Sequence, residues 1–161
     1  MDWSTALSTL VGAVVGVGSA LVVDRARWRR ERHQQRQQAR QDAYVAYLAA
    51  LHHANGAIRA ISLGPDDAGT HGATTRAAFR SAGVVEAREH VILLAPESVA
   101  VAADAVFQCL RTLRDIVAQG QQLGSPDYEL ALRAYDDGLH ALRDAIRADL
   151  GLERLQTRVS L

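Results

Sequence analysis

Apolar residues along this chain fall into one continuous run near the N-terminus and four periodic stripes after it. The run covers residues 6–23, reads ALSTLVGAVVGVGSALVV and contains no charged residue. Its length is close to the minimum of about 18 residues with which a helix crosses the hydrocarbon core of a bilayer. The pattern therefore predicts a single transmembrane helix within residues 1–24.

Two other interpretations of the run stay open. A cleaved signal peptide would carry positive charge before its apolar core, whereas here Asp2 precedes the run and the arginines follow it. A buried helix of a soluble protein would normally show a polar stripe, and this run has none. Trp3 and Trp28 flank the run, where interfacial aromatic residues would lie, and this favours the membrane span.

Small residues recur at every fourth position of the run and so share one face of the predicted helix. They are Ser4, Ser8, Gly12, Gly16 and Ala20, and the two glycines form a GxxxG pair. Small residues allow two membrane helices to approach closely, although a GxxxG pair by itself is common in such helices. We predict that the chain self-associates as a homo-oligomer through Ser8, Gly12, Gly16 and Ala20.

An arginine-rich segment follows the run. Residues 24–42 read DRARWRRERHQQRQQARQD, without Gly or Pro, so the helix should continue through residues 25–41 as a basic juxtamembrane neck. Positive flanks of membrane spans remain in the cytoplasm. We therefore expect a protein of the cell membrane, with its N-terminus outside and everything after the span in the cytoplasm.

The arginines nearest the run are predicted to contact membrane lipid, since a cation near the anionic inner leaflet gains about 1 kcal/mol. This set comprises Arg25, Arg27, Arg29, Arg30 and Arg32. Binding of nucleic acid by the neck is disfavoured, because no recognition module is evident and Trp28 is the only interleaved aromatic residue. Two such necks side by side in a dimer would repel each other, and the sequence does not show what relieves this repulsion.

Four amphipathic segments follow the neck, each with apolar residues three and four positions apart. The expected buried stripes are Tyr44, Tyr47, Leu51, Ala54, Ile58 and Ile61 in the first segment; Ala77, Val84, Ala87, Val91 and Leu94 in the second; Val99, Ala103, Val106, Leu110, Leu113 and Val117 in the third; and Tyr128, Leu132, Tyr135, Leu139, Leu142 and Ile146 in the fourth. The second segment, over residues 73–94, is the least regular, because Arg80 and Ser81 interrupt its stripe.

Helices of similar length joined by short loops predict an all-α protein with an antiparallel four-helix bundle over residues 42–151 and a short tail at 152–161. The clearest helix start is Ser125 as N-cap with Pro126 at the first helical position. Pro96 should likewise begin the third helix. The pair Ala95 and Pro96 is either a tight reversal or a kink in one long helix, in which case another subunit would complete the bundle.

Charge is distributed unevenly along the chain, although 18 basic residues balance 18 acidic ones. All basic residues are arginines, and seven of them lie between Asp24 and Arg40. From Gln41 onward, 15 acidic residues face 11 arginines, so a basic neck joins a mildly acidic body. The single cysteine, Cys109, excludes an intramolecular disulfide and a cysteine-based zinc site.

No constellation of residues demands a particular chemistry, so we predict no catalytic residue, cofactor or metal site, and no enzyme. A carboxylate-bridged di-metal bundle needs Glu-x-x-His on two helices, whereas this chain has only one related pattern, Asp137-x-x-His140. All the candidate side chains are expected to face water: His52, His53, Glu86, Glu89, His90, Asp136, Asp137 and His140. Cys109 lies beside the third stripe and should pack as a small hydrophobe.

These observations favour an interaction protein: a membrane-anchored helical scaffold that self-associates and recruits a cytoplasmic protein partner. A membrane-tethered sensor, whose bundle holds a small ligand, is the first alternative, and a pocket lined by tyrosines and histidines would support it. A membrane-perturbing protein, like a toxin or holin, is the second. Whether the bundle forms within one chain or between chains stays open, as do the oligomer number and the partner.

Overall fold

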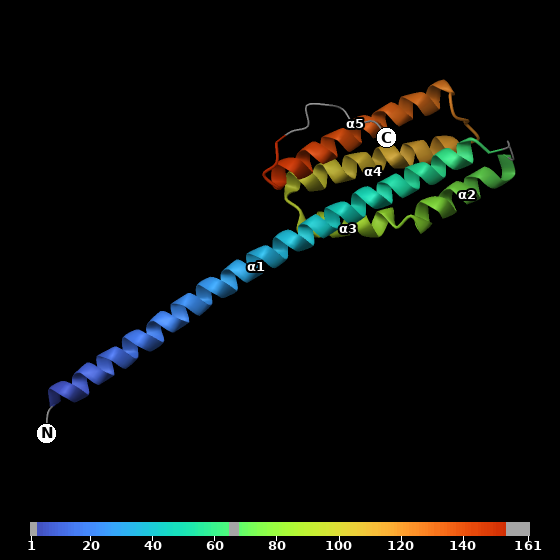
Figure 1. Ribbon diagram of the computed structural model, residues 1–161. Helices are drawn as coiled ribbons and strands as arrows, with labels where there is room; N and C mark the ends of the chain where they lie inside the picture. The colour runs from blue at the N-terminus through green and yellow to red at the C-terminus, as the bar shows by residue number, and fades with distance from the viewer. Residues whose placement is uncertain (1–2, 65–67, 154–161) are drawn as a thin grey trace. The chain divides into compact units, whose positions relative to one another are not determined.

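The computed structural model describes the backbone of residues 3–64 and 68–153 (Figure 1). Its helices are α1 (Trp3–Ser62), α2 (Ala68–Ser81), α3 (Val84–Leu94), α4 (Glu97–Ala118) and α5 (Pro126–Asp149). These described residues contain no strand, which confirms the all-α class. The chain divides into two compact units, residues 1–39 and residues 40–161, and α1 contributes to both.

In the first unit, α1 covers the predicted neck, which is therefore helical as expected. Side chains are described here at Trp28, Arg32 and residues 34–39. Within the part of the chain that the structure describes, no helix is long and apolar enough to cross a membrane. The predicted span and several predicted contacts have side chains outside that part: residues 6–23, including Ser8, Gly12, Gly16 and Ala20, and then Arg25, Arg27, Arg29 and Arg30.

The second unit is a bundle of the later part of α1 with α2, α3, α4 and α5 around one hydrophobic core. The stripes predicted for the first, third and fourth segments are confirmed. Every member of the third stripe is buried, and in the other two only Ile61 and Leu132 remain half-buried. Strict spacing by three and four residues identified these faces because burial of one helix face imposes that period.

Contacts between distant residues give the direction of the helices in the second unit. Arg40 and Tyr44, early in this unit, both bind Asp149 at the end of α5, so α1 and α5 run antiparallel there. Figure 1 shows α4 and α5 side by side, joined by a turn. Arg88 of α3 binds Asp104 of α4, so the chain reverses at the intervening Ala95–Pro96 turn rather than kinking.

The single helix predicted over residues 73–94 is wrong: the chain forms two helices there. The second segment starts earlier, at Ala68, and is interrupted at Ala82 and Gly83. Gly83 has φ +66°, in the left-handed region that costs a residue with a Cβ atom roughly 1–2 kcal/mol. A glycine therefore allows α2 to end and α3 to begin almost at once.

The interruption at Gly83 also changes which residues are buried. Ala77 and Leu94, both predicted to face inward, are exposed. α2 instead buries His71, Thr75 and Phe79, which are four residues apart, whereas α3 buries Val84 and Val91 and half-buries Ala87. No single stripe can describe both helices, because the left-handed residue rotates the second helix relative to the first.

The predicted helix starts are confirmed at α5 and corrected at α4. The Ser125 side chain accepts a hydrogen bond from the Tyr128 N–H at 3.4 Å, and Pro126 is the first helical residue. Pro96 was expected in the first turn of the third helix. It is instead the N-cap of α4, with ψ at 159°, and the helix begins at Glu97. Its fixed φ suits both positions, which is why sequence alone misplaced it by one residue.

Candidate functional site

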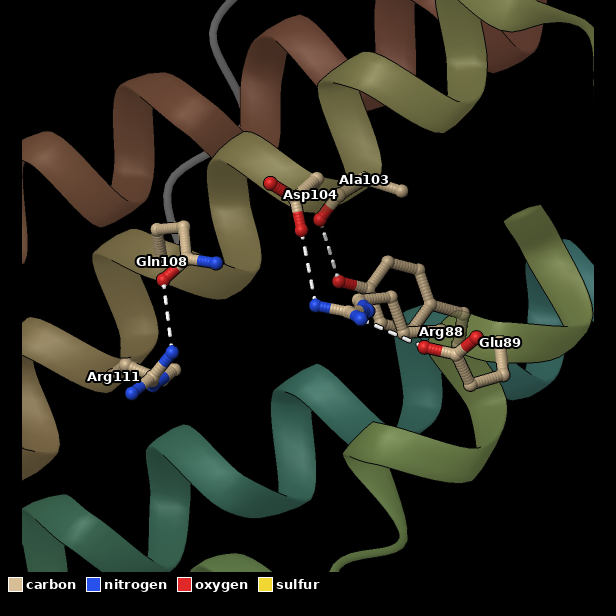
Figure 2. Close-up of polar contacts among 7 residues, drawn as sticks. Arg88, Glu89, Ala103, Asp104, Gln108 and Arg111 are labelled. Carbon is tan, nitrogen blue, oxygen red and sulfur yellow. Dashed lines mark hydrogen bonds and ion pairs between the residues drawn. The ribbon is translucent and has the colours of Figure 1, made fainter.

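The side chain of Arg88 joins α3 to α4 at the surface of the bundle (Figure 2). Its Nη1 donates to Asp104 Oδ1 at 3.0 Å, and its Nη2 donates to Glu89 Oε1 at 2.7 Å. Both carboxylates are 51% exposed, whereas the Arg88 side chain is mostly covered. The contact with Asp104 joins the two helices, whereas the contact with Glu89 lies within α3 and holds the second arm of the guanidinium fork.

Aromatic rings lie beneath these ion pairs and connect them to α2. The Arg88 guanidinium is 4.4 Å from the centroid of the Phe107 ring, which lies 5.8 Å from that of Phe79 on α2. Arg114 and Arg111 also lie over these rings, at 4.9 Å from Phe79 and 6.0 Å from Phe107. Both phenylalanines of the chain are thus placed where arginines from two helices cover their faces.

Two buried tyrosines fill the interior next to this junction. The Tyr47 hydroxyl donates to the Ala103 carbonyl at 2.8 Å, and the Tyr135 hydroxyl donates to the Leu51 carbonyl at 3.3 Å. Burial raises the pKa of both phenols above the ordinary value of 10.0, so they stay protonated at alkaline pH as well as at neutral pH. The tyrosines therefore act as packed hydrogen-bond donors between helices.

The other two tyrosines lie at opposite ends of the bundle, near the two ends of α5. Tyr44 donates to Asp149 at 2.7 Å, and Arg40 binds the other oxygen of the same carboxylate at 3.0 Å. Burial, with the neighbouring Asp149, raises the pKa of Tyr44. Tyr128, at the start of α5, lies near Ser62 at the end of α1, and burial raises its pKa as well.

Large apolar side chains are exposed on the outer side of α3 and the adjoining side of α4. They are Val85, Ile92 and Leu93 of α3 and Val101 of α4, of which Leu93 is 78% and Val101 64% exposed. Four of the five carboxylates on these two helices are Glu86, Glu89, Glu97 and Asp104, and the fifth, Asp115 near the end of α4, pairs with Arg114. We refer to the four aliphatic residues and the first four carboxylates as the α3–α4 face. A contiguous exposed apolar surface with a polar rim is typical of a site for binding another molecule.

The titratable residues considered from sequence do not converge on one centre. His52, His53, Glu86, Glu89 and His90 are exposed, as expected. Asp136 and His140 are half-buried instead, and desolvation raises the pKa of Asp136 while His140 opposes that rise. Among the described residues, no three His, Cys, Asp or Glu side chains are arranged to hold a metal ion.

Cys109 is half-buried and packs against the hydrophobic core from α4, as predicted. Burial raises the pKa of its thiol, which lowers the population of the reactive thiolate. In the neck, the guanidinium of Arg32 lies 5.0 Å from the centroid of the Trp28 ring, one turn earlier in α1. Arg32 is exposed, so this contact leaves its charge accessible to solvent.

Sequence reasoning missed the Arg88 junction and the α3–α4 face. The interruption of the second stripe at Arg80 and Ser81 was the available signal that one helix did not continue. The predicted stripe left Ile92 and Leu93 out of the buried side, but it did not show that they lie beside exposed residues of α4. No family model, no curated protein and no solved structure matches this chain.

Proposed function

We propose that this protein is a membrane-anchored helical interaction protein that recruits a protein partner through its second unit. The observation that carries the interaction role is the α3–α4 face, where four aliphatic side chains are exposed on two helices that pack against the core with their other sides. The fold in this proposal is a transmembrane helix within residues 1–24, a basic neck, and a bundle in which α2 and α3 together replace one of four antiparallel helices.

The anchor is supported by the uncharged run at residues 6–23 and by the arginines directly after it. This charge asymmetry orients the chain with its N-terminus outside and the bundle in the cytoplasm. Arg25, Arg27, Arg29, Arg30 and Arg32 then contact anionic headgroups of the inner leaflet. Arg32 is exposed on α1, which suits that role.

A bundle filled by side chains favours an interaction role over storage of a small ligand. Tyr47, Leu51, Leu110, Leu113 and Leu142 are all fully buried within one core. The hydroxyls of Tyr47 and Tyr135 bind backbone carbonyls, so these two phenols are already occupied. The sensor with a tyrosine-lined pocket is therefore the weaker proposal. The toxin-like alternative has no observation in its favour beyond the run itself.

Membrane fractionation tests the anchor. We expect the full chain to sediment with membranes and to require detergent for extraction, because residues 6–23 would lie in the bilayer. A chain that begins at Gln41 lacks the run and the neck and should remain in the supernatant with a helical circular dichroism spectrum. Recovery of the full chain in the supernatant without detergent would contradict the anchor.

Self-association through Ser8, Gly12, Gly16 and Ala20 is the second element of the proposal. A bulky side chain on this face would hold the two helix backbones apart. Gly12→Ile and Gly16→Ile should therefore abolish the signal of a membrane two-hybrid assay, whereas Val15→Ile, off the face, should preserve it. A signal that both glycine variants leave unchanged would contradict self-association through this face.

A further inference from the structure

We infer that the α3–α4 face binds a basic amphipathic helix of a partner protein. The inference deepens the interaction role proposed above, since it names the chemistry of the partner, and to that extent it rests on that proposal. It does not depend on the anchor, because all the residues that carry it lie in the second unit.

The Arg88–Asp104 ion pair places the exposed aliphatic residues of the two helices beside each other. α3 and α4 are antiparallel neighbours, and these two side chains meet at 3.0 Å. Ile92 lies one turn after Arg88 in α3, and Val101 lies about one turn before Asp104 in α4. Moving one turn in opposite chain directions along antiparallel helices leads to the same level, so Ile92 and Val101 lie on neighbouring parts of one surface.

Val85, Ile92 and Leu93 extend this surface along α3. Positions separated by seven and eight residues lie on one side of a helix, and here they span about 10 Å at 1.5 Å per residue. Two turns of a partner helix cover such a length with apolar residues at three- and four-residue spacing. Burial of these aliphatic side chains against the partner provides the favourable free energy of binding.

The charges around the surface determine which partner fits. Glu86, Glu89, Glu97 and Asp104 contribute four carboxylates, and Arg88 is already bound to two of them. Arg111 of α4 binds Gln108 (Figure 2) and lies 6.0 Å from the Phe107 ring that Arg88 also covers, so it is a second positive charge near this surface. Four carboxylates against two arginines leave the rim net negative, and complementary charge steers a Lys- or Arg-rich partner toward it.

The same charges disfavour the other occupants. A second copy docked through this face would bring acidic rims together, and like charges placed opposite each other oppose association. Anionic lipid and nucleic acid carry the same sign as the rim and are repelled as well. A positively charged helix with an apolar side satisfies both parts of the surface at once.

Two synthetic helical peptides of about 18 residues, or five turns, test the inference. Both carry leucines on one side, and the other side is lysine in one peptide and glutamate in the other. Binding to the full chain in mild detergent is measured by fluorescence anisotropy against the same detergent without protein, an assay that does not require the anchor. We expect the lysine peptide to bind the chain at least about tenfold more tightly than the glutamate peptide, a ratio well within the range of charge-dependent recognition.

Leu93→Ser removes the most exposed apolar side chain of the face and should lower the affinity for the lysine peptide by about tenfold or more. Leu130→Ser is the matched control, because Leu130 is a similarly exposed leucine, at 67%, on α5. Glu86→Arg should weaken binding of the lysine peptide and strengthen binding of the glutamate peptide. Circular dichroism of each variant verifies that the helices are retained.

Three results would overturn the inference. One is an equal change in the affinity for the lysine peptide in Leu93→Ser and in Leu130→Ser. Another is equal affinity for the two peptides. The third is an association that Leu93→Ser abolishes and Leu130→Ser does not. If that association is a dimer in sedimentation velocity, the occupant of the face is a second copy of this chain. If it is binding to phosphatidylserine vesicles, the occupant is a membrane. Fractionation decides the anchor independently, so failure of one proposal is distinguishable from failure of the other.

Discussion

Leu110→Ala is expected to lower the free energy of unfolding by about 2–5 kcal/mol, the range measured for removal of a buried leucine side chain. Leu110 is fully buried in α4, and it belongs to the core shared by the helices of the second unit. The deletion loses the transfer free energy of the removed carbons and leaves a cavity that a bundle packed on all sides cannot close completely.

Urea denaturation of the full chain in mild detergent, followed by circular dichroism at 222 nm as a standard helix signal, measures this effect. Leu130→Ala is the matched control, because Leu130 is 67% exposed on α5 and its truncation should change stability by less than about 0.5 kcal/mol. Equal losses in the two variants would show that Leu110 does not belong to a closed core.

Arg88→Ala is expected to lower the free energy of unfolding by about 1–3 kcal/mol. Each ion pair contributes little, about 0.2–1 kcal/mol, because Asp104 and Glu89 are half-exposed to solvent. The contact with the Phe107 ring, shielded beneath the surface, adds about 0.5–2 kcal/mol. The aliphatic stem of Arg88 also covers that ring, and alanine would expose it.

Arg88→Lys separates charge from geometry. A lysine keeps the positive charge, but its single ammonium cannot present two parallel arms to two carboxylates or stack as a plane on Phe107. We expect it to recover only part of the stability lost in Arg88→Ala. Arg133→Ala serves as the control, since Arg133 is exposed on α5 and donates to the Glu129 carbonyl of the same helix. Full recovery by lysine would show that charge alone matters at this junction.

The fold was largely predictable where one helix face is buried over its whole length. The first, third and fourth segments of the second unit each bury a regular apolar stripe, and the pattern identified those helices and their inward residues. Tyr47 and Tyr135 were part of these stripes. Their hydroxyl partners, Ala103 and Leu51, are backbone carbonyls on other helices, and no sequence pattern marks which carbonyl a tyrosine reaches.

The prediction for the second segment was wrong for identifiable physical reasons. α2 buries His71 and Thr75, which a search for apolar periodicity excludes from the core. The Thr75 hydroxyl binds the His71 carbonyl within its own helix, so burial leaves the threonine hydroxyl satisfied. Gly83 then shifts the positions at which buried residues recur. A glycine within a helical segment does not by itself indicate a left-handed conformation, so the sequence did not predict this shift.

The α3–α4 face could not be found from sequence, because it depends on how two helices pack. Glu89 and Asp104 are 15 positions apart and come together only through Arg88 after the chain reverses. The predicted stripe already placed Val84 and Val91 on the buried side of this segment and left out Ile92 and Leu93. The sequence did not show that the chain reverses after α3 and brings exposed residues of α4 beside them.

The contact of Arg40 and Tyr44 with Asp149 has a consequence for protein synthesis. These partners are separated by 109 and 105 positions, so the carboxylate that holds the start of the bundle is made long after the residues that it binds. During translation, α3 and α4 can pair as a local hairpin, and Tyr47 can already bind α4, whereas Tyr44 and Leu51 have partners on α5, which is synthesised last. Tyr44 and Leu51 are therefore the residues that a chaperone would have to shield longest on the nascent chain.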